Sequence, residues 1–145
     1  MPMRQSSLFR WIPAAISLWL CGALFAVFGI FNFWLSELSA RGALPHSIGG
    51  GTDNPRSLLR GAVENGAVAA LCILGWYCLR RRTPASVRGA TLAVTVALLI
   101  TVGRWLHWQL MGANQLPWLE PMLVWPFFLY AIVYGYRESR ASVAH

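Results

Sequence analysis

Charged residues are scarce in this chain of 145 residues. Only 12 are Lys or Arg and 5 are Asp or Glu, so 12% of the sequence is charged, whereas 57% is apolar. An ordinary soluble domain has about 25% charged residues. A water-soluble domain of this length would need more polar surface than these residues supply, so a soluble enzyme is nearly excluded.

The sequence also lacks the motifs of common catalytic, metal-binding and phosphate-binding sites. Its three cysteines, Cys21, Cys72 and Cys78, lack the Cys-x-x-Cys spacing of redox or metal sites, and we interpret them as small packing residues. The glycine run at residues 49–52 has no Lys-Ser/Thr after it, unlike a phosphate-binding loop, and no nucleophile constellation is present. No basic stretch is interleaved with aromatic residues. We therefore expect no metal, no cofactor and no nucleic-acid partner.

Long stretches without charge stand out instead. Arg10 and Glu37 bracket 26 uncharged residues, and a bilayer core of about 30 Å needs roughly 20 helical residues. Three further uncharged runs contain 15, 15 and 16 residues, so each must extend past an ionisable residue to span a membrane. The predicted spans are residues 12–35, 58–79, 89–108 and 117–136, with an outer loop at 39–57.

These spans predict an all-α integral membrane four-helix bundle that forms a single domain, residues 1–145. Cytoplasmic flanks of membrane helices are enriched in Lys and Arg, and this distribution predicts that both termini lie in the cytoplasm. The net charge of +7 then reflects this topology and attraction to anionic lipids. The arginines assigned to the inner side are Arg4, Arg10, Arg80, Arg81, Arg82, Arg88, Arg137 and Arg140.

Aromatic residues fall at the predicted membrane interfaces, where Trp and Tyr are enriched in membrane proteins. The short inner loop contains Arg80, Arg81 and Arg82, which we interpret as a topology anchor, with binding of acidic lipids as the alternative. The predicted inner aromatic belt is Trp11, Trp76, Tyr77, Tyr134 and Tyr136, and the outer belt is Trp34, Trp105, Trp108 and Trp118.

Three of the predicted spans carry a charged residue well inside the membrane segment. Counted from the inner helix ends, Glu64 and Arg104 are about 22 Å deep and Glu120 about 24 Å, so they share one layer near the outer leaflet. Intramembrane charges usually face the bundle interior or a wet cavity. The predicted polar layer, or ligand site, consists of Arg60, Glu64, Asn65, Arg104, His107 and Glu120.

Two interpretations of this layer stay open. Two arginines balance two glutamates, which favours a paired network that clamps three helices, since buried charges persist when paired and hydrogen-bonded. The alternative is a ligand site or a proton relay, in which Glu64 or Glu120 exchanges protons with His107. Small residues such as Gly22, Gly29 and Gly66 also predict close approach of the first two helices.

The stretch from about residue 55 to residue 130 resembles an uncharacterised bacterial family of small four-helix membrane proteins related to the DoxX-like group. This family favours Tyr-Gly-Gly after the arginine of helix two and Asp-Gly in the outer turn, and residues 63–65 and 111–112 differ from that pattern. The resemblance implies a four-helix membrane fold with Arg60, Arg104 and Glu120 as signature polar residues, and with it we expect a multi-pass protein of the bacterial inner (plasma) membrane. Some DoxX-like proteins are described as subunits of quinone-linked oxidoreductases. The matching residues are Arg60, Gly66, Gly103-Arg104, Gly112, Pro117 and Glu120.

The leading hypothesis is a small integral membrane protein that acts as a non-catalytic accessory subunit or lipophile-binding module, with its polar layer near the outer leaflet. One alternative is a small proton-coupled transporter that uses Glu64, His107 and Glu120. Another, from the resemblance, is a membrane enzyme or subunit acting on a quinone or lipid. Expected partners are membrane lipids, a quinone or other lipophile, and other chains in a homo-oligomer or larger membrane complex.

Overall fold

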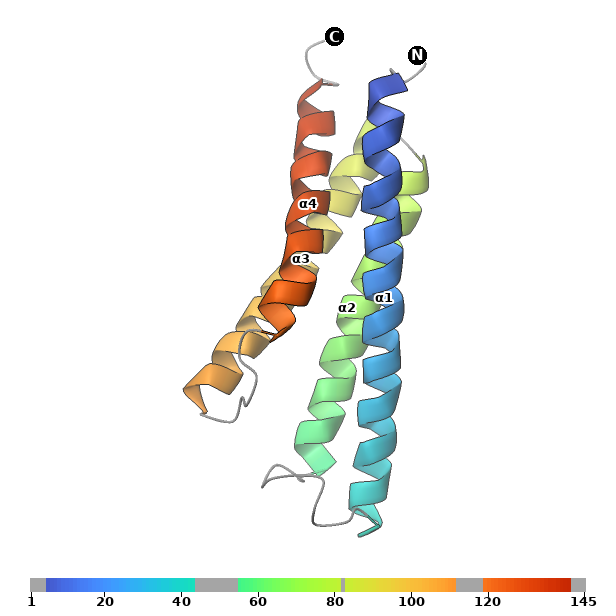
Figure 1. Cartoon of the computed structure of the whole chain (residues 1–145). Helices are drawn as coiled ribbons and strands as arrows, with labels where there is room; N and C mark the ends of the chain where they lie inside the picture. Colours follow the sequence, from blue (N-terminus) through green and yellow to red (C-terminus); the bar gives the residue numbers. More distant parts are fainter. Residues whose placement is uncertain (1–4, 44–54, 82, 112–118, 142–145) are drawn as a thin grey trace.

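Four α-helices make up the part of the chain that the computed structural model describes, residues 5–43, 55–81, 83–111 and 119–141 (Figure 1). Side chains are described from residue 12 in the first helix and from residue 121 in the last. The all-α fold class expected from the sequence is confirmed for these residues. The helices are α1 (Gln5–Ala40), α2 (Pro55–Arg81), α3 (Pro84–Leu110) and α4 (Leu119–Ala141).

Three helices of the described part are long and apolar enough to cross a membrane. They are α1 from Ile12 to Ala40, with 29 residues, and α2 and α3, with 27 residues each. A helix of 27 residues is about 40 Å long and exceeds a hydrocarbon core of about 30 Å. The fourth helix, α4, is not among these three. It begins at Leu119, whereas the predicted span begins at Pro117, which lies outside the described residues.

The first helix ends at a glycine, as many helices do. Gly42 has a φ of 65°, a left-handed conformation that costs glycine little. The chain then folds back, and the amide of Ala43 donates to the carbonyl of Leu38 at 2.9 Å. Because α1 continues to Ala40 and α2 begins at Pro55, the connection is shorter at both ends than the loop predicted over 39–57. Residues 44–54 lie outside the described part.

The start of α3 is fixed by a capping box. The Thr83 hydroxyl accepts a hydrogen bond from the amide of Ser86 at 3.2 Å, and the Ser86 hydroxyl accepts one from the amide of Thr83 at 3.0 Å. Pro84 occupies the first helical position, where its missing N–H costs nothing. These contacts fix the first turn of α3.

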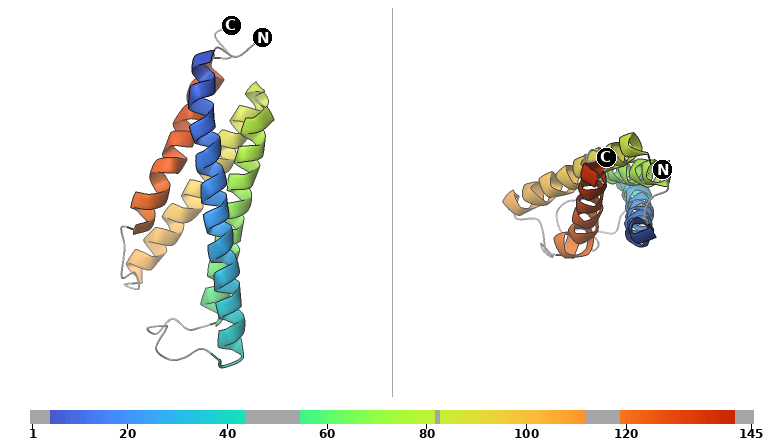
Figure 2. Two further views of the ribbon diagram at one scale, coloured as in Figure 1. Left: turned by 45° about the vertical axis from the view of Figure 1, so that its right-hand side comes forward. Right: turned by 90° about the horizontal axis from the view of Figure 1, so that it is seen from above.

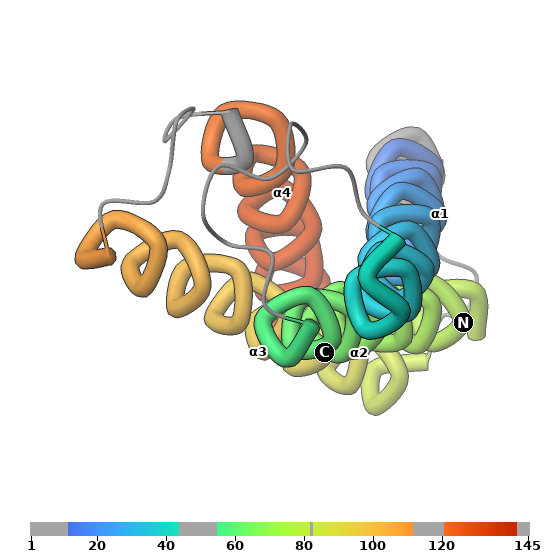
Figure 3. The backbone as a smooth tube through the Cα atoms, turned by 90° about the horizontal axis from the view of Figure 1, so that it is seen from below, coloured from blue at the N-terminus to red at the C-terminus, as the bar shows by residue number. Residues whose placement is uncertain are grey.

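Each helix packs against two neighbours, so the bundle closes in the order α1, α2, α3, α4. The start of α1 and the end of α4 lie at the same end of the bundle (Figures 1 and 2). Toward the opposite end, the last turns of α3 and the first turns of α4 diverge from α1 and α2, as the view along the bundle shows (Figure 3). The bundle is therefore closely packed at one end and splayed at the other.

Glycines bring neighbouring helices close together. A Cβ atom added at Gly22 would lie 3.3 Å from the Cβ of Cys72, and one at Gly29 would lie 3.4 Å from the carbonyl oxygen of Ala62. A Cβ atom at Gly29 would also lie 3.4 Å from the backbone nitrogen of Gly66, so all three of these glycines lie where α1 approaches α2, although a Cβ atom at Gly66 itself would meet open space. The sequence interpretation missed a further approach at Gly135 on α4, which packs directly on α3.

Aromatic rings join α1 to α4 where the packed part of the bundle meets the splayed part. Phe25 on α1 and Phe128 on α4 stack with their ring centroids 6.3 Å apart, and both side chains are buried. Below this stack, in the direction of the splayed helices, the bundle contains a cavity.

Candidate functional site

A cavity of about 400 Å³ lies between all four helices at the splayed end of the bundle. It is lined by the second half of α1, the first half of α2, the last turns of α3 and the early part of α4. One part of its wall is polar and another part is apolar, and we call it the polar cavity. Its volume is within the range of about 300–1,000 Å³ that small-molecule sites occupy.

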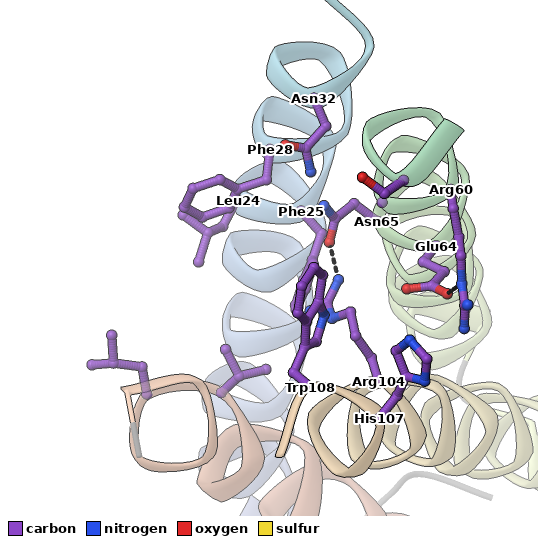
Figure 4. A pocket seen from close by; sticks show the side chains of 14 residues that line it. Leu24, Phe25, Phe28, Asn32, Arg60, Glu64, Asn65, Arg104, His107 and Trp108 are labelled. Carbon is purple, nitrogen blue, oxygen red and sulfur yellow. Dashed lines mark hydrogen bonds and ion pairs between the residues drawn. The ribbon is translucent and has the colours of Figure 1, made fainter. Parts of the chain in front are cut away.

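Five of the six side chains that the sequence singles out line this cavity (Figure 4). The sixth, Glu120, lies on α4, and its side chain is outside those described. Side chains on α2 and α3 that the sequence predicts at a similar depth thus lie around one cavity. The five are Arg60, Glu64, Asn65, Arg104 and His107.

Arg104 holds the centre of the polar wall. Its Nη1 donates a hydrogen bond to Oδ1 of Asn65, which joins α3 to α2, and Asn65 is 5% exposed. Its Cζ also lies 5.6 Å from the centroid of the Phe25 ring on α1, a distance suited to a cation–π interaction. Residues from three helices therefore orient one guanidinium group beside the cavity.

The ion pair of the cavity wall lies within a single helix. Arg60 donates from Nε to Oε1 of Glu64 at 2.7 Å, one turn along α2. The Arg60 side chain is 60% exposed and that of Glu64 is 23% exposed. Among the side chains that the structure describes, this pair does not tie helices together, unlike the bond from Arg104 to Asn65. The clamp interpretation expects a link between helices. Among these side chains that link is the hydrogen bond from the charged Arg104 to the neutral amide of Asn65, not an ion pair.

Three further polar side chains around the cavity have no hydrogen bond from the described part of the chain. They are Asn32 on α1, and His107 and Trp108 on α3. The rings of His107 and Trp108 meet edge to face, with centroids 6.2 Å apart. The amide of Asn32, the indole N–H of Trp108 and the imidazole are all able to donate a hydrogen bond to a ligand.

Asn32 is the cavity residue that sequence reasoning missed. It lies in the uncharged run of α1, where counting charges gives no signal. A single amide within 26 uncharged residues was the available clue. The structure places Asn32 against α2, because a Cβ atom at Gly61 would lie only 3.2 Å from the Asn32 Nδ2. A glycine at this position leaves room for the amide.

The apolar wall reaches the outside of the bundle between α1 and α4. Leu24 and Phe28 on α1 and Leu123 on α4 line the cavity and are 44%, 49% and 56% exposed, respectively. A chain-like apolar group could therefore enter sideways, from the region that lipid would occupy, and meet the polar wall inside. This arrangement suits a molecule with one polar end and one apolar end.

The described residues contain no group of three His, Cys, Asp or Glu side chains that could hold a metal ion. A scan against models of protein families found no match, and searches of the curated proteins and of the solved structures found no significant match either.

Proposed function

We propose that this chain is a small multi-pass protein of a bacterial inner membrane that binds a lipophile in the polar cavity and acts as an accessory subunit or binding module without catalysis of its own. The observation that carries the proposal is a cavity with a donor-rich wall on one side and exposed apolar residues on the other, set among helices apolar enough to span a membrane. Ligand pockets typically combine apolar walls with a few placed polar groups.

The proposed topology has four spans and both termini in the cytoplasm. Its support is a set of arginines stacked on aromatic rings near the end of the bundle where α1 starts and α4 ends. Arg81 lies 4.8 Å from the centroid of the Tyr77 ring, and Arg140 lies 4.8 Å from that of Tyr136. Aromatic residues are typical of both membrane interfaces, and an excess of arginine is typical of the cytoplasmic one.

The proposed ligand carries oxygen acceptors at its polar end. Two of the acceptors on the wall, the Asn65 Oδ1 and the Glu64 Oε1, already bind arginine. The wall also contains donors, among them the guanidinium of Arg104, which has five N–H groups and uses one of them on Asn65. A carbonyl, ester or carboxylate group would accept hydrogen bonds here, while its chain lies against Leu24 and Leu123.

The resemblance to the DoxX-like group leads to a narrower form of this proposal, in which the lipophile is a quinone and the partner is an oxidoreductase. Two signature residues of that resemblance, Arg60 and Arg104, both line the cavity, which supports it. A quinone also has two carbonyl acceptors and an apolar tail. The larger assembly would be a homo-oligomer or a membrane complex with this partner.

A second candidate is a small proton-coupled transporter. The observation in its favour is that a carboxylate and an imidazole, Glu64 and His107, line the same cavity. Proton relays in membranes use such groups. A single bundle of four helices would have to oligomerise to provide the two halves that many transporters have.

The test of lipophile binding is to fill the cavity and measure what the protein retains. Leu123→Trp places a bulky ring at the apolar wall, and Leu129→Trp is the matched control on α4, because Leu129 is 52% exposed and does not line the cavity. After purification in a mild detergent, bound lipophiles are extracted and identified by mass spectrometry. We expect wild type and Leu129→Trp to retain the same molecule and Leu123→Trp to lose it. Equal retention by all three proteins would overturn the proposal.

A further inference from the structure

A second hollow lies at the other end of the bundle, between α1 and α2. It has a volume of about 330 Å³, and we call it the terminal groove. Its walls are apolar except at one point, where an arginine of the last turn of α2 closes it. The lining residues are Ile12, Ala15, Ile16, Trp19, Trp76 and Arg80.

The arginine of the groove differs from its neighbour in its partners. Arg81 donates a hydrogen bond to the Tyr77 hydroxyl at 2.5 Å and stacks on the same ring. Arg80 lies over the ring of Trp76, with 5.1 Å from its Cζ to the ring centroid, and its side chain has no hydrogen bond or ion pair from the described part of the chain. The stack holds the guanidinium at the rim of the groove while its N–H groups stay able to donate.

The groove has the length and direction of part of a lipid chain. Ile12 and Trp19 are seven residues apart, which is about 10 Å along α1. The groove therefore extends from the charged rim at Arg80 along the helix toward the middle of the bundle. Ile12, Ile16 and Trp19 are each about half exposed, so their apolar surface is available to a lipid.

We propose that the terminal groove is a binding site for one anionic phospholipid of the inner leaflet. Its phosphate accepts hydrogen bonds from Arg80, and one acyl chain packs on Ile16 and Trp19. Guanidinium groups bind phosphate through two parallel N–H bonds. The negative charge of an anionic head group also attracts Arg80, whereas a zwitterionic head group brings a second cation close to it. The proposal rests on the membrane location proposed above but does not depend on what fills the polar cavity.

The experiment uses the full chain in an uncharged detergent and counts bound lipids by native mass spectrometry. Phosphatidylglycerol and phosphatidylcholine with the same acyl chains are titrated separately. We expect wild type to bind one phosphatidylglycerol about fivefold more tightly than phosphatidylcholine, as one arginine near a charged lipid surface provides. Arg80→Gln should remove this preference, whereas Arg81→Gln should keep it.

The apolar half of the site has its own pair of variants. Ile16→Trp fills the groove without changing charge, and Ile30→Trp is the control, because Ile30 is 71% exposed on α1 and lies outside the groove. We expect Ile16→Trp to lose the bound phospholipid and Ile30→Trp to keep it. Both positions are exposed, so melting of the variants should match wild type and exclude misfolding as the cause of a loss.

Three results would overturn the proposal. If Arg80→Gln and Arg81→Gln lost the preference for phosphatidylglycerol equally, the lipid would be held by general attraction to positive charge and not by Arg80. Equal binding of both lipids by wild type would mean that the site does not prefer an anionic head group. Displacement by glycerol phosphate at the concentration of the lipid would mean an anion site that needs no acyl chain. Failure of the cavity proposal is seen separately, because Leu123→Trp should leave the phospholipid count unchanged.

Discussion

Arg104 on α3 donates a hydrogen bond to the side-chain oxygen of Asn65 on α2, and both residues line the polar cavity. A charged group away from water is costly unless hydrogen bonds compensate for its lost hydration. Asn65 is itself buried, so its amide has few alternatives if Arg104 is removed. This bond therefore both stabilises the splayed end and holds a cation at the cavity.

Asn65→Val should destabilise the protein by about 1.5–3 kcal/mol, the usual range for a hydrogen bond to a charged group. The substitution removes the acceptor while the guanidinium remains beside the cavity. Thermal unfolding in detergent, followed by circular dichroism, measures the effect. Val63→Ala is a suitable control, because Val63 is 65% exposed on the same helix and its loss should leave the melting temperature unchanged. A melting curve for Asn65→Val that coincides with wild type would contradict this role.

Glu64→Gln should change stability by less than about 1 kcal/mol, because partly exposed ion pairs contribute little. Its partner Arg60 is 60% exposed and lies on the same helix, so no link between helices is broken. The same variant separates the binding module from the transporter. In vesicles that contain a pH-sensitive dye, we expect no proton flux from either wild type or Glu64→Gln. Flux in wild type that disappears in Glu64→Gln would favour the transporter.

Much of the polar cavity could be predicted from the sequence because charge in a membrane segment is rare and helical rise is constant. Counting residues from the inner helix ends predicts the same depth for Glu64 and Arg104, and both line one cavity in the structure. Their partners could not be predicted in this way. The Arg104 bond to Asn65 and the position of Asn32 depend on how the helices rotate and diverge, which depth alone does not determine.

The close contact of α3 and α4 could not be predicted from the sequence either, because it also depends on how the helices rotate. Gly135 looks like any glycine in an apolar run, and only the packed structure places the Oγ1 of Thr91 where its Cβ atom would be. The terminal groove is similar, since Arg80 is separated from Ile16 by more than sixty residues and meets it only because α1 and α2 are antiparallel.

Gly135→Ala should destabilise the protein by about 1–3 kcal/mol, the usual cost of overpacking. The added methyl group overlaps the hydroxyl of Thr91, so α4 must shift away from α3. Gly66→Ala is the matched control, because nothing lies within 4 Å of its added Cβ atom and alanine favours a helix. Adding Thr91→Ala to Gly135→Ala should restore part of the lost stability. Absence of any such rescue would mean that the contact at Thr91 is not the cause.

The proposed topology requires α4 to cross the membrane as the fourth span. Within the residues that the structure describes, three helices are long and apolar enough to span a membrane and α4 is not among them, so the proposed fourth span needs evidence of its own. Alkaline phosphatase is active only outside the cytoplasm, and we expect activity when it is fused after Gly42 or Met111. Fusion after Arg81 or Ala141 should be inactive, because arginines near these ends stay in the cytoplasm.

The two fusions around α4 distinguish four spans from three. If α4 crosses the membrane, activity after Met111 is high and activity after Ala141 is low. Equal activity at both positions would mean that α4 lies on one side, and the polar cavity would then lose the wall that Leu123 and Val124 provide. High activity after Arg81 would reverse the orientation and place the terminal groove in the outer leaflet. Green fluorescent protein at the same four positions is the complementary control, because it should fluoresce only where the phosphatase is inactive.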